Sequence, residues 1–362
     1  MKAAICYEFK KPLVIEEVDL DPPQTGEVKV RLAAVAICHS DVHLIRGEWI
    51  NWSVNPPAVA GHEAAGVVEV VGEGVTLAAP GDPVVVSLMR WCGRCYYCTQ
   101  GAPYMCEGKF ALASEKRLHN KHGQPLNQGI STGAFAEYVV VDQSQVVKVP
   151  AQMPLDRACL LACGVITGYG AVVNTAQVGS GSSVVVIGTG GVGLNSVQAA
   201  ALSGAYPIIA VDVLDKKLEA ARSFGASHTL NARQANVVAE VKALTSGRGA
   251  DYAFVTVGSP DAVVQALDMV RRAGTVVAVG MPATGAVAPL PVGQFVYDGK
   301  KVIGSNIGST RLRVDIPRLV ELYQAGRLKL DELITARYPL EQINEAIEAM
   351  ERGEALRNVI VF

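Results

Sequence analysis

The stretch Ser183-Val184-Val185-Val186-Ile187-Gly188-Thr189-Gly190-Gly191-Val192-Gly193 joins an apolar run to four closely spaced glycines. An apolar segment over 194–202 follows it, so the pattern predicts a buried strand, a tight turn and a helix in that order. Glycines in such a turn let the backbone approach a pyrophosphate, and the helix N-terminus stabilises the phosphate charge. The stretch therefore predicts a dinucleotide-binding fold.

A second expected strand, 208–212, ends in the carboxylate of Asp212. Asp212 follows the last glycine at about the 20-residue spacing at which such folds place an acid on the adenosine ribose. Its charge would repel a 2′-phosphate, so we expect NAD rather than NADP. The strands that would extend a parallel sheet, and one helix between them, are expected at 250–257, 275–279, 302–305 and 262–271.

The composition limits the classes of protein to consider. A chain of 362 residues with 50% apolar residues predicts a well-packed protein of two domains. The net charge of -2 gives no electrostatic footprint for nucleic acid or an anionic membrane, and neither is expected as a partner. The sequence has no membrane-spanning apolar run and no signal segment, which favours a cytoplasmic location. In a reducing compartment the 8 cysteines are read as metal ligands or buried thiols.

The first 150 residues alternate short β-branched runs with turn residues, which predicts an all-β unit, such as a partly closed barrel. Between the β-like runs, the stretch 107–133 is polar and is expected to be irregular. We assign no role to its histidines, His119 and His122, because no third ligand accompanies them. The strands are expected at 13–18, 27–36, 64–71, 83–87, 135–141 and 146–149.

Metal-binding side chains gather at the end of one of these strands, in Cys38-His39-Ser40-Asp41-Val42-His43. The next strand begins at Gly61-His62-Glu63, where an imidazole and a carboxylate could fold back onto Cys38. If Cys38 and His62 hold a metal, Cys163 is a candidate third ligand, although a lone cysteine in an apolar run is more often a small buried side chain. Three protein ligands with one open position are typical of a catalytic zinc.

A second group consists of Cys92, Cys95, Cys98 and Cys106. Four thiolates in so short a span can close a tetrahedral shell and leave no position for chemistry, which favours a structural zinc. Disulfides or free thiols are the alternatives, and iron-sulfur proteins commonly use other spacings. Too few basic residues surround the group for a nucleic-acid-binding zinc ribbon.

Together the motifs resemble those of the zinc-dependent alcohol dehydrogenases in the medium-chain dehydrogenase/reductase superfamily, along essentially the whole chain. The resemblance implies an α/β fold: a GroES-like β-barrel catalytic domain and a Rossmann cofactor domain with a doubly wound parallel sheet. The catalytic domain would span 1–163, with a zinc lobe at about 90–110, and the cofactor domain 164–306; residues 307–362 would return to the catalytic domain. The matching motifs are Cys38 to Asp41, Gly61 to Glu63, the four-cysteine group, Cys163 to Gly170, Gly188 to Gly193 and Leu356 to Phe362.

The resemblance also implies two zinc ions per chain, one catalytic and one structural. Cys38, His62 and Cys163 would bind the catalytic zinc, with Glu63 close behind as an outer or transient ligand. Asp41 would hydrogen-bond to His62 and orient it.

The implied reaction is hydride transfer to NAD from a zinc-bound alkoxide. Ser40 would take the alcohol proton, and His43 would receive that proton by way of the cofactor ribose. The product would be an aldehyde or ketone.

The cofactor would bind the glycine turn, and Lys217 would support Asp212 at the ribose. His39 and Arg357 would meet the pyrophosphate. From the residues alone, Lys217 would be read as part of a solvated helix face and Arg357 as part of a surface ion pair. The turn residues expected at the cofactor are Gly188, Gly190, Gly191, Val192 and Gly193.

The substrate is less defined by the sequence. Trp49 and Trp52 lie in a loop that lines the pocket in this family, and they would form an aromatic wall for a bulky or aromatic alcohol; simple packing is an equal alternative. The long stretch 107–133 resembles the formaldehyde dehydrogenases that oxidise glutathione or mycothiol adducts, which are the alternative function. A remote alternative is a non-catalytic cofactor-binding protein. The family suggests a homodimer, with a tetramer as the other possibility.

Overall fold

The structure, a computed structural model, describes residues 1–49 and 55–362. These residues form two units of different architecture, Met1–Gly164 with Arg311–Phe362, and Val165–Thr310. The mixed β and α/β architecture confirms the predicted fold class.

A closed five-stranded barrel forms one part of the first unit, where the sequence predicted a partly closed one. Its core is apolar, with Ile5 and Leu126 fully buried. The expectation of an irregular stretch at 107–133 is wrong, because two of the barrel strands lie in it as an antiparallel hairpin. The barrel strands, in order around the barrel, are β1 (Lys2–Cys6), β2 (Val14–Leu20), β7 (Leu118–Asn120), β8 (Pro125–Gln128) and β4 (Ala58–Val59).

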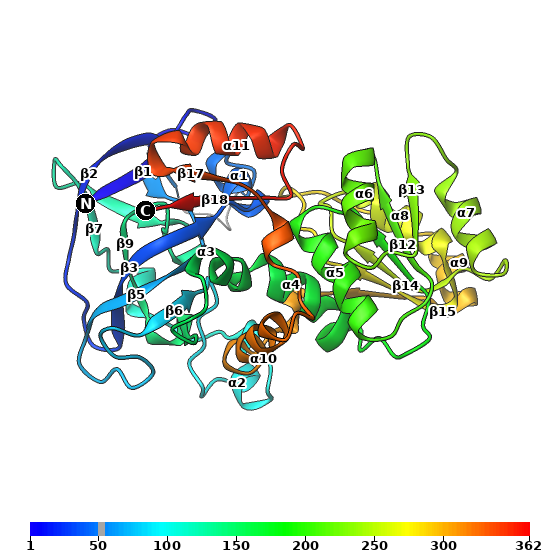
Figure 1. The fold of residues 1–362 in the computed structure, drawn as a ribbon, viewed down its shortest axis with the longest axis horizontal. Helices are drawn as coiled ribbons and strands as arrows, with labels where there is room; N and C mark the ends of the chain where they lie inside the picture. The colour runs from blue at the N-terminus through cyan, green and yellow to red at the C-terminus, as the bar shows by residue number, and fades with distance from the viewer. Residues whose placement is uncertain (50–54) are drawn as a thin grey trace. The chain divides into compact units, whose positions relative to one another are not determined.

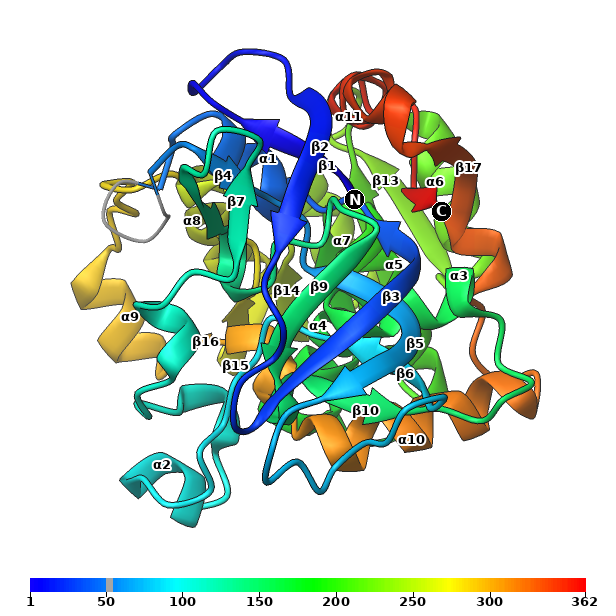
Figure 2. The ribbon, with the colours of Figure 1, turned by 90° about the vertical axis from the view of Figure 1, so that its left-hand side faces the viewer.

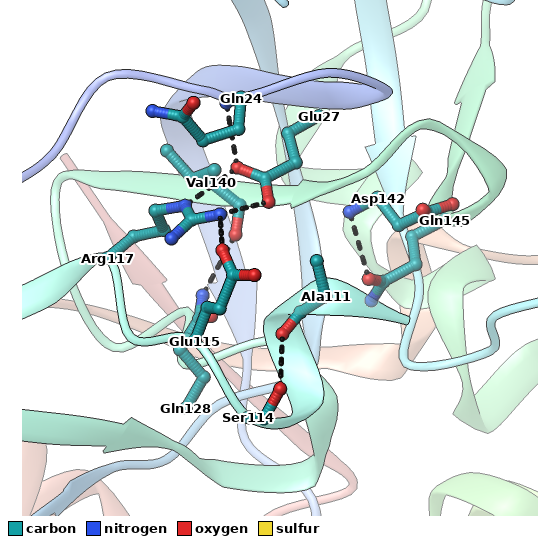
Figure 3. A network of polar contacts seen from close by, with 10 residues as sticks. All are labelled: Gln24, Glu27, Ala111, Ser114, Glu115, Arg117, Gln128, Val140, Asp142 and Gln145. Carbon is teal, nitrogen blue, oxygen red and sulfur yellow. Dashed lines mark hydrogen bonds and ion pairs between the residues drawn. The ribbon is translucent and has the colours of Figure 1, made fainter. Parts of the chain in front are cut away.

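A buried ion pair joins Arg117, within that stretch, to Glu27 elsewhere in the unit (Figure 3). Arg117 donates from Nε and Nη2 to the Glu27 carboxylate at 2.9 and 2.8 Å, and also to Glu115 at 2.7 Å. A bidentate pair with both charges hydrogen-bonded satisfies the groups that burial would otherwise leave unpaired. The polar residues of the stretch therefore include a core contact, which hydrophobic patterning does not reveal.

A seven-stranded sheet forms the other part of the first unit, and Figure 2 shows several of its strands side by side. The last strand of the chain, β18, pairs antiparallel with β3 through Val359 and Ala36. The C-terminal segment is therefore a structural part of this unit. The strands are β10 (Val146–Lys148), β6 (Pro83–Val86), β5 (Glu63–Val71), β3 (Glu27–Ala36), β18 (Arg357–Val361) and β17 (Ile334–Pro339), with β9 (Tyr138–Asp142) also paired to β3.

The helices of this unit are α1 (His39–Ile45), α2 (Tyr96–Thr99), α3 (Leu155–Ala158), α10 (Leu312–Gln324) and α11 (Ile343–Glu351). Helix α4 (Gly164–Gly170) begins at the boundary of the two units. No single helix among the described residues is long and apolar enough to cross a membrane. One bent pair of helical segments, Leu155–Ala162 with Gly164–Thr175, would be long and apolar enough when the two are taken together, by length and composition alone.

The second unit is a parallel six-stranded sheet with the strand order β13-β12-β11-β14-β15-β16. Helices α5 and α6 pack on β11 and β12, and α8 packs on β14 and β15 (Figure 1). The elements in chain order are β11 (Val184–Ile187), α5 (Gly191–Leu202), β12 (Ile208–Asp212), α6 (Asp215–Ser223), β13 (His228–Asn231), α7 (Val237–Leu244), β14 (Ala250–Val255), α8 (Pro260–Met269), β15 (Val270–Ala278), α9 (Val292–Asp298) and β16 (Lys301–Gly304).

The order reverses direction at β11, since β12 lies on one side of it and β14 on the other. In open parallel sheets this switch point, at the carboxyl ends of the strands, is where ligands bind. The glycine turn Gly188 to Gly190 leaves β11 at that end.

Gly193 at the start of α5 and Gly190 in the turn meet different surroundings. A Cβ on Gly193 would lie 1.8 Å from the carbonyl oxygen of Gly188, because α5 packs closely on the turn. A Cβ on Gly190 would meet no protein atom within 4 Å. Gly193 is needed for packing, whereas Gly190 leaves open space.

We therefore expect Gly193→Ala to destabilise the second unit by about 1–3 kcal/mol, the usual cost of overpacking. This corresponds to roughly 2–12 °C in thermal midpoint for a unit of this size. Gly190→Ala is the matched control and should leave the midpoint unchanged. Calorimetry measures both variants; equal midpoints would contradict the packing argument.

Candidate active site

Four candidate metal ligands meet in the first unit: Cys38, His62, Glu63 and Cys163. One ligand atom from each lies within 4.8 Å of the others. They come from three separate segments, namely the start of α1, the start of β5 and the residue before α4. The fold therefore brings together the three residues expected to bind the catalytic zinc and the glutamate expected behind them.

The local backbone explains how two of these ligands face each other. Strand β3 ends at Ala36, and Cys38 is the N-cap of α1 with extended backbone angles. Gly61 precedes His62 with a φ of +90°, and a Cβ there would lie 2.6 Å from the backbone nitrogen of Phe135. Only glycine fits this turn, which delivers His62 to the end of β3.

The carboxylate of Asp41 fixes both segments. It is fully buried and accepts hydrogen bonds from the backbone N–H of Cys38 at 3.1 Å and that of Gly61 at 2.9 Å. Nδ1 of His62 lies 2.9 Å from the same carboxylate. Because a carboxylate can only accept, Nδ1 carries the proton and Nε2 is the nitrogen available to a metal.

Glu63 lies beside these ligands and is bound by Arg357 of β18. Burial raises the pKa of Glu63 to about 7, against the opposing effect of the Arg357 guanidinium. Its Oε2 accepts from Arg357, while Oε1 is buried and has no hydrogen-bond partner among the described residues. A buried acceptor of this kind beside two thiols suits a cation.

The thiol of Cys38 is also set up for metal binding. The hydrogen bond with Cys163 is the largest cause that lowers the pKa of Cys38 well below its ordinary value. The hydrogen bond and charge of His62 lower this pKa further. The thiolate is the form that binds metal. Two thiolates and one imidazole are the donor set of a catalytic zinc site, so the residues present fit a zinc ion.

The second cysteine group also comes together, with the sulfur atoms of Cys92, Cys95, Cys98 and Cys106 all within 4.8 Å of one another. Hydrogen bonds from backbone amides, that of Cys98 first, lower the pKa of Cys95 to about 6, while desolvation raises the pKa of Cys106 to about 12. Four thiols this close cannot all ionise without a compensating cation. All 8 cysteines are free thiols, so this group is not a pair of disulfides.

The residues expected to move the proton lie on α1. Ser40 and His43 are three positions apart, which places them on one face of the helix. Nδ1 of His43 lies 2.6 Å from Oε2 of Glu48, and its ring stacks on Trp49 with centroids 5.0 Å apart. Trp49 is only 8% exposed, and one face of its ring packs on His43.

Two further expected residues can be placed only in part. His39 is exposed at the start of α1, and its ring lies 6.2 Å from that of His43. Trp52, the other candidate for the substrate pocket, lies outside the described residues. Arg357, expected at the cofactor pyrophosphate, is 6% exposed and is paired with Glu63 in this structure, so its ion pair is a buried one.

Two residues expected at the cofactor, Asp212 and Lys217, lie at the end of β12 and in the helix that follows it. Asp212 accepts from the backbone N–H and the hydroxyl of Thr189 at 2.7 and 3.0 Å. Its other oxygen accepts from the backbone N–H of Val213 at 2.7 Å and that of Leu214 at 3.1 Å. These bonds hold the carboxylate beside the glycine turn, and Lys217 lies half-buried in the following helix α6.

Sequence reasoning missed two polar partners. Glu48 follows the turn after α1 and meets His43, and Thr189 lies inside the glycine turn and meets Asp212. Thr189 occupies a variable position of the glycine motif, so its residue type gave no signal. The short separation of His43 and Glu48 could have indicated their contact.

Comparisons with known proteins agree with this geometry. Residues 24–151 match the family described as alcohol dehydrogenase GroES-like domain, and residues 191–325 match zinc-binding dehydrogenase. The chain is 40% identical to putative alcohol dehydrogenase D of Mycobacterium tuberculosis over 371 residues, covering 99% of each chain. It is 39% identical to the NDMA-dependent alcohol dehydrogenase of Amycolatopsis methanolica over 369 residues, covering 99% of this chain and 98% of the relative.

A solved structure is similar along the full length. Benzyl alcohol dehydrogenase from Acinetobacter calcoaceticus aligns with a TM-score of 0.92 and 32% identity, covering 100% of this chain and 99% of that one. The two family matches, the full-length relatives and the two clusters of candidate metal ligands all indicate the same family. The chain therefore belongs to the zinc-type alcohol dehydrogenases of the medium-chain dehydrogenase/reductase superfamily.

Proposed function

We propose that the protein oxidises an alcohol to an aldehyde or ketone with NAD as hydride acceptor, and that Cys38, His62 and Cys163 hold the catalytic zinc. The observation that carries the proposal is the convergence of these three ligand atoms with Glu63. When bound there, zinc acts as a Lewis acid and makes an alcohol hydroxyl more acidic.

The protein's own residues place the reactants and move the proton. Asp41 holds His62 in one tautomer, so that its Nε2 points to the ligand cluster. Ser40 accepts the proton of the alcohol as it gives up its own toward His43 on the same face of α1. Glu63 offers its unpartnered Oε1 as an outer or transient ligand while Oε2 stays hydrogen-bonded to Arg357.

The cofactor site lies at the switch point of the second unit. The open space at Gly190 supports close approach of a pyrophosphate to the backbone, next to the N-terminus of α5. Asp212 supports the adenosine ribose, with Lys217 nearby and His39 and Arg357 toward the phosphates. The carboxylate favours NAD, because a 2′-phosphate would meet its negative charge.

An aromatic alcohol is the favoured substrate. The similar structure from Acinetobacter calcoaceticus is a benzyl alcohol dehydrogenase, and Trp49 lies beside His43. A second candidate concerns the electron acceptor: a relative covering the whole chain is NDMA-dependent, which supports a test of that acceptor in place of free NAD.

A homodimer formed through the second unit completes the proposal, with a tetramer as the alternative assembly. Strand β16 lies at the edge of its sheet in the described part of the chain. Apolar side chains in the segment that precedes it in the chain are exposed, and a second copy would bury them. These residues are Val287, Val292, Val296 and Tyr297.

Metal analysis tests the zinc assignment. We expect two zinc ions per chain, and Cys38→Ser should remove one of them and abolish turnover while NADH binding is kept. Cys95→Ser should remove the other, and Cys6→Ala, a buried thiol outside both clusters, should keep both. Elemental analysis with a fluorescence titration of NADH gives these numbers. Loss of NADH binding in Cys38→Ser would contradict the role given to this cysteine.

Cofactor preference tests Asp212. Asp212→Asn removes the charge and keeps one of the two acceptor oxygens, so the ratio of kcat/KM with NAD to that with NADP should fall about tenfold or more, equivalent to roughly 1.4 kcal/mol. Asp215→Asn, which removes a neighbouring carboxylate on α6, is the control. An unchanged ratio in the Asp212 variant would count against its place at the ribose.

Substrate profiling tests the reaction itself. Zinc-replete protein is assayed for NADH formation with aliphatic and aromatic alcohols, and with formaldehyde plus glutathione or mycothiol; NDMA is tested with and without added NAD. We expect turnover of aromatic alcohols with NAD and without a thiol. Activity only with a thiol adduct would assign the protein to the formaldehyde dehydrogenases, and activity only with NDMA would replace free NAD as acceptor. No turnover in any of these assays would favour a non-catalytic cofactor-binding protein.

A further inference from the structure

The contact between His43 and Glu48 has no part in the function proposed so far. Nδ1 of His43 and Oε2 of Glu48 are 2.6 Å apart, and both side chains are largely shielded, at 19% and 33% exposed. A contact this short between an imidazole and a carboxylate is a charge-assisted hydrogen bond.

The backbone after α1 creates this contact. The helix ends at Ile45, and Gly47 adopts a left-handed φ of +67° that reverses the chain. The N–H of Glu48 then donates to the carbonyl of His43 at 2.9 Å. Glu48 is thereby fixed over the histidine by main-chain geometry as well as by its own side chain.

Other groups restrict both partners. The Trp49 ring stacks on the His43 ring with an interplanar angle of 23°. The His39 ring lies edge-on to the His43 ring. Arg46 lies 4.0 Å from the other oxygen of Glu48 and pairs at 2.5 Å with Glu351 of α11. The imidazole is therefore held on one edge by Glu48 and on one face by Trp49.

We propose that Glu48 is a positioning residue that fixes His43 as the Nδ1–H tautomer and so presents Nε2 as the proton acceptor. A carboxylate can only accept from Nδ1–H, which leaves the lone pair on Nε2. This inference rests on the proposed function, in which a proton passes from Ser40 toward His43.

The proton balance is simple. The proton that leaves through Ser40 binds Nε2, and His43 becomes an imidazolium with both nitrogens protonated. Glu48 remains ionised and keeps its hydrogen bond from Nδ1–H, so its negative charge stabilises the cation. The proton then leaves Nε2 for solvent, and the starting tautomer is restored.

Nitrogen-15 NMR of the histidine-labelled, zinc-replete protein tests the tautomer without any substrate. The His43 signal is assigned by its loss in His43→Gln. We expect protonated Nδ1 and unprotonated Nε2 in the original protein, and loss of this preference in Glu48→Leu. Glu351→Gln, which removes the other carboxylate at Arg46 but does not touch His43, is the matched control and should change nothing. An Nε2–H tautomer in the original protein, or an unchanged Glu48→Leu spectrum, would overturn the proposal.

Kinetics tests the consequence. Glu48→Leu should lower kcat for alcohol oxidation about tenfold or more, the usual effect of removing an orienting partner, with KM for the alcohol little changed. Glu48→Gln keeps hydrogen-bonding capacity and should lose less. The double variant Glu48→Leu with His43→Gln should be no slower than His43→Gln alone, because both act through one group.

The outcomes separate this proposal from the function on which it rests. Additive losses in the double variant, or full activity of Glu48→Leu, would overturn the role of Glu48 and leave the alcohol dehydrogenase activity in place. Absence of activity in the original protein would overturn the proposed function and, with it, the proton-accepting role of His43, whatever tautomer the spectrum shows.

Discussion

The buried carboxylate of Asp41 is the constraint on which the candidate metal site depends. A carboxylate removed from water is costly unless its oxygens are hydrogen-bonded, and this one accepts from two backbone N–H groups and one imidazole. Those donors belong to the start of α1 and the turn before β5. One side chain thus joins two ligand-bearing segments and selects the tautomer of His62.

The C-terminal strand completes the same site from another direction. Strand β18 pairs with β3, and this pairing brings Arg357 to Glu63. The guanidinium compensates the charge that Glu63 carries when ionised, while burial favours its protonated form. The return of the chain to the first unit therefore has an electrostatic as well as a structural role.

In the second unit, the glycine turn leaves its backbone open to the approach of an anionic ligand. The tight approach of Gly193 to Gly188 fixes α5 on the turn, and the open space at Gly190 leaves room for a ligand. Thr189 and two backbone amides saturate Asp212, so its carboxylate has a defined position. The charge of Asp212 is therefore held in one place beside the glycine turn.

The sequence alone determined the features whose residues are close together in the chain. The four-cysteine spacing and the glycine turn with Asp212 are local patterns, and short covalent connections limit how such residues can be arranged. The tertiary structure decided which distant residues meet. Arg357 and Glu63 are 294 positions apart, and their contact exists only because β18 pairs beside β3. The hairpin within 107–133 and its buried Arg117 were likewise hidden, because polar residues in a short strand resemble a solvated loop until their partners are known.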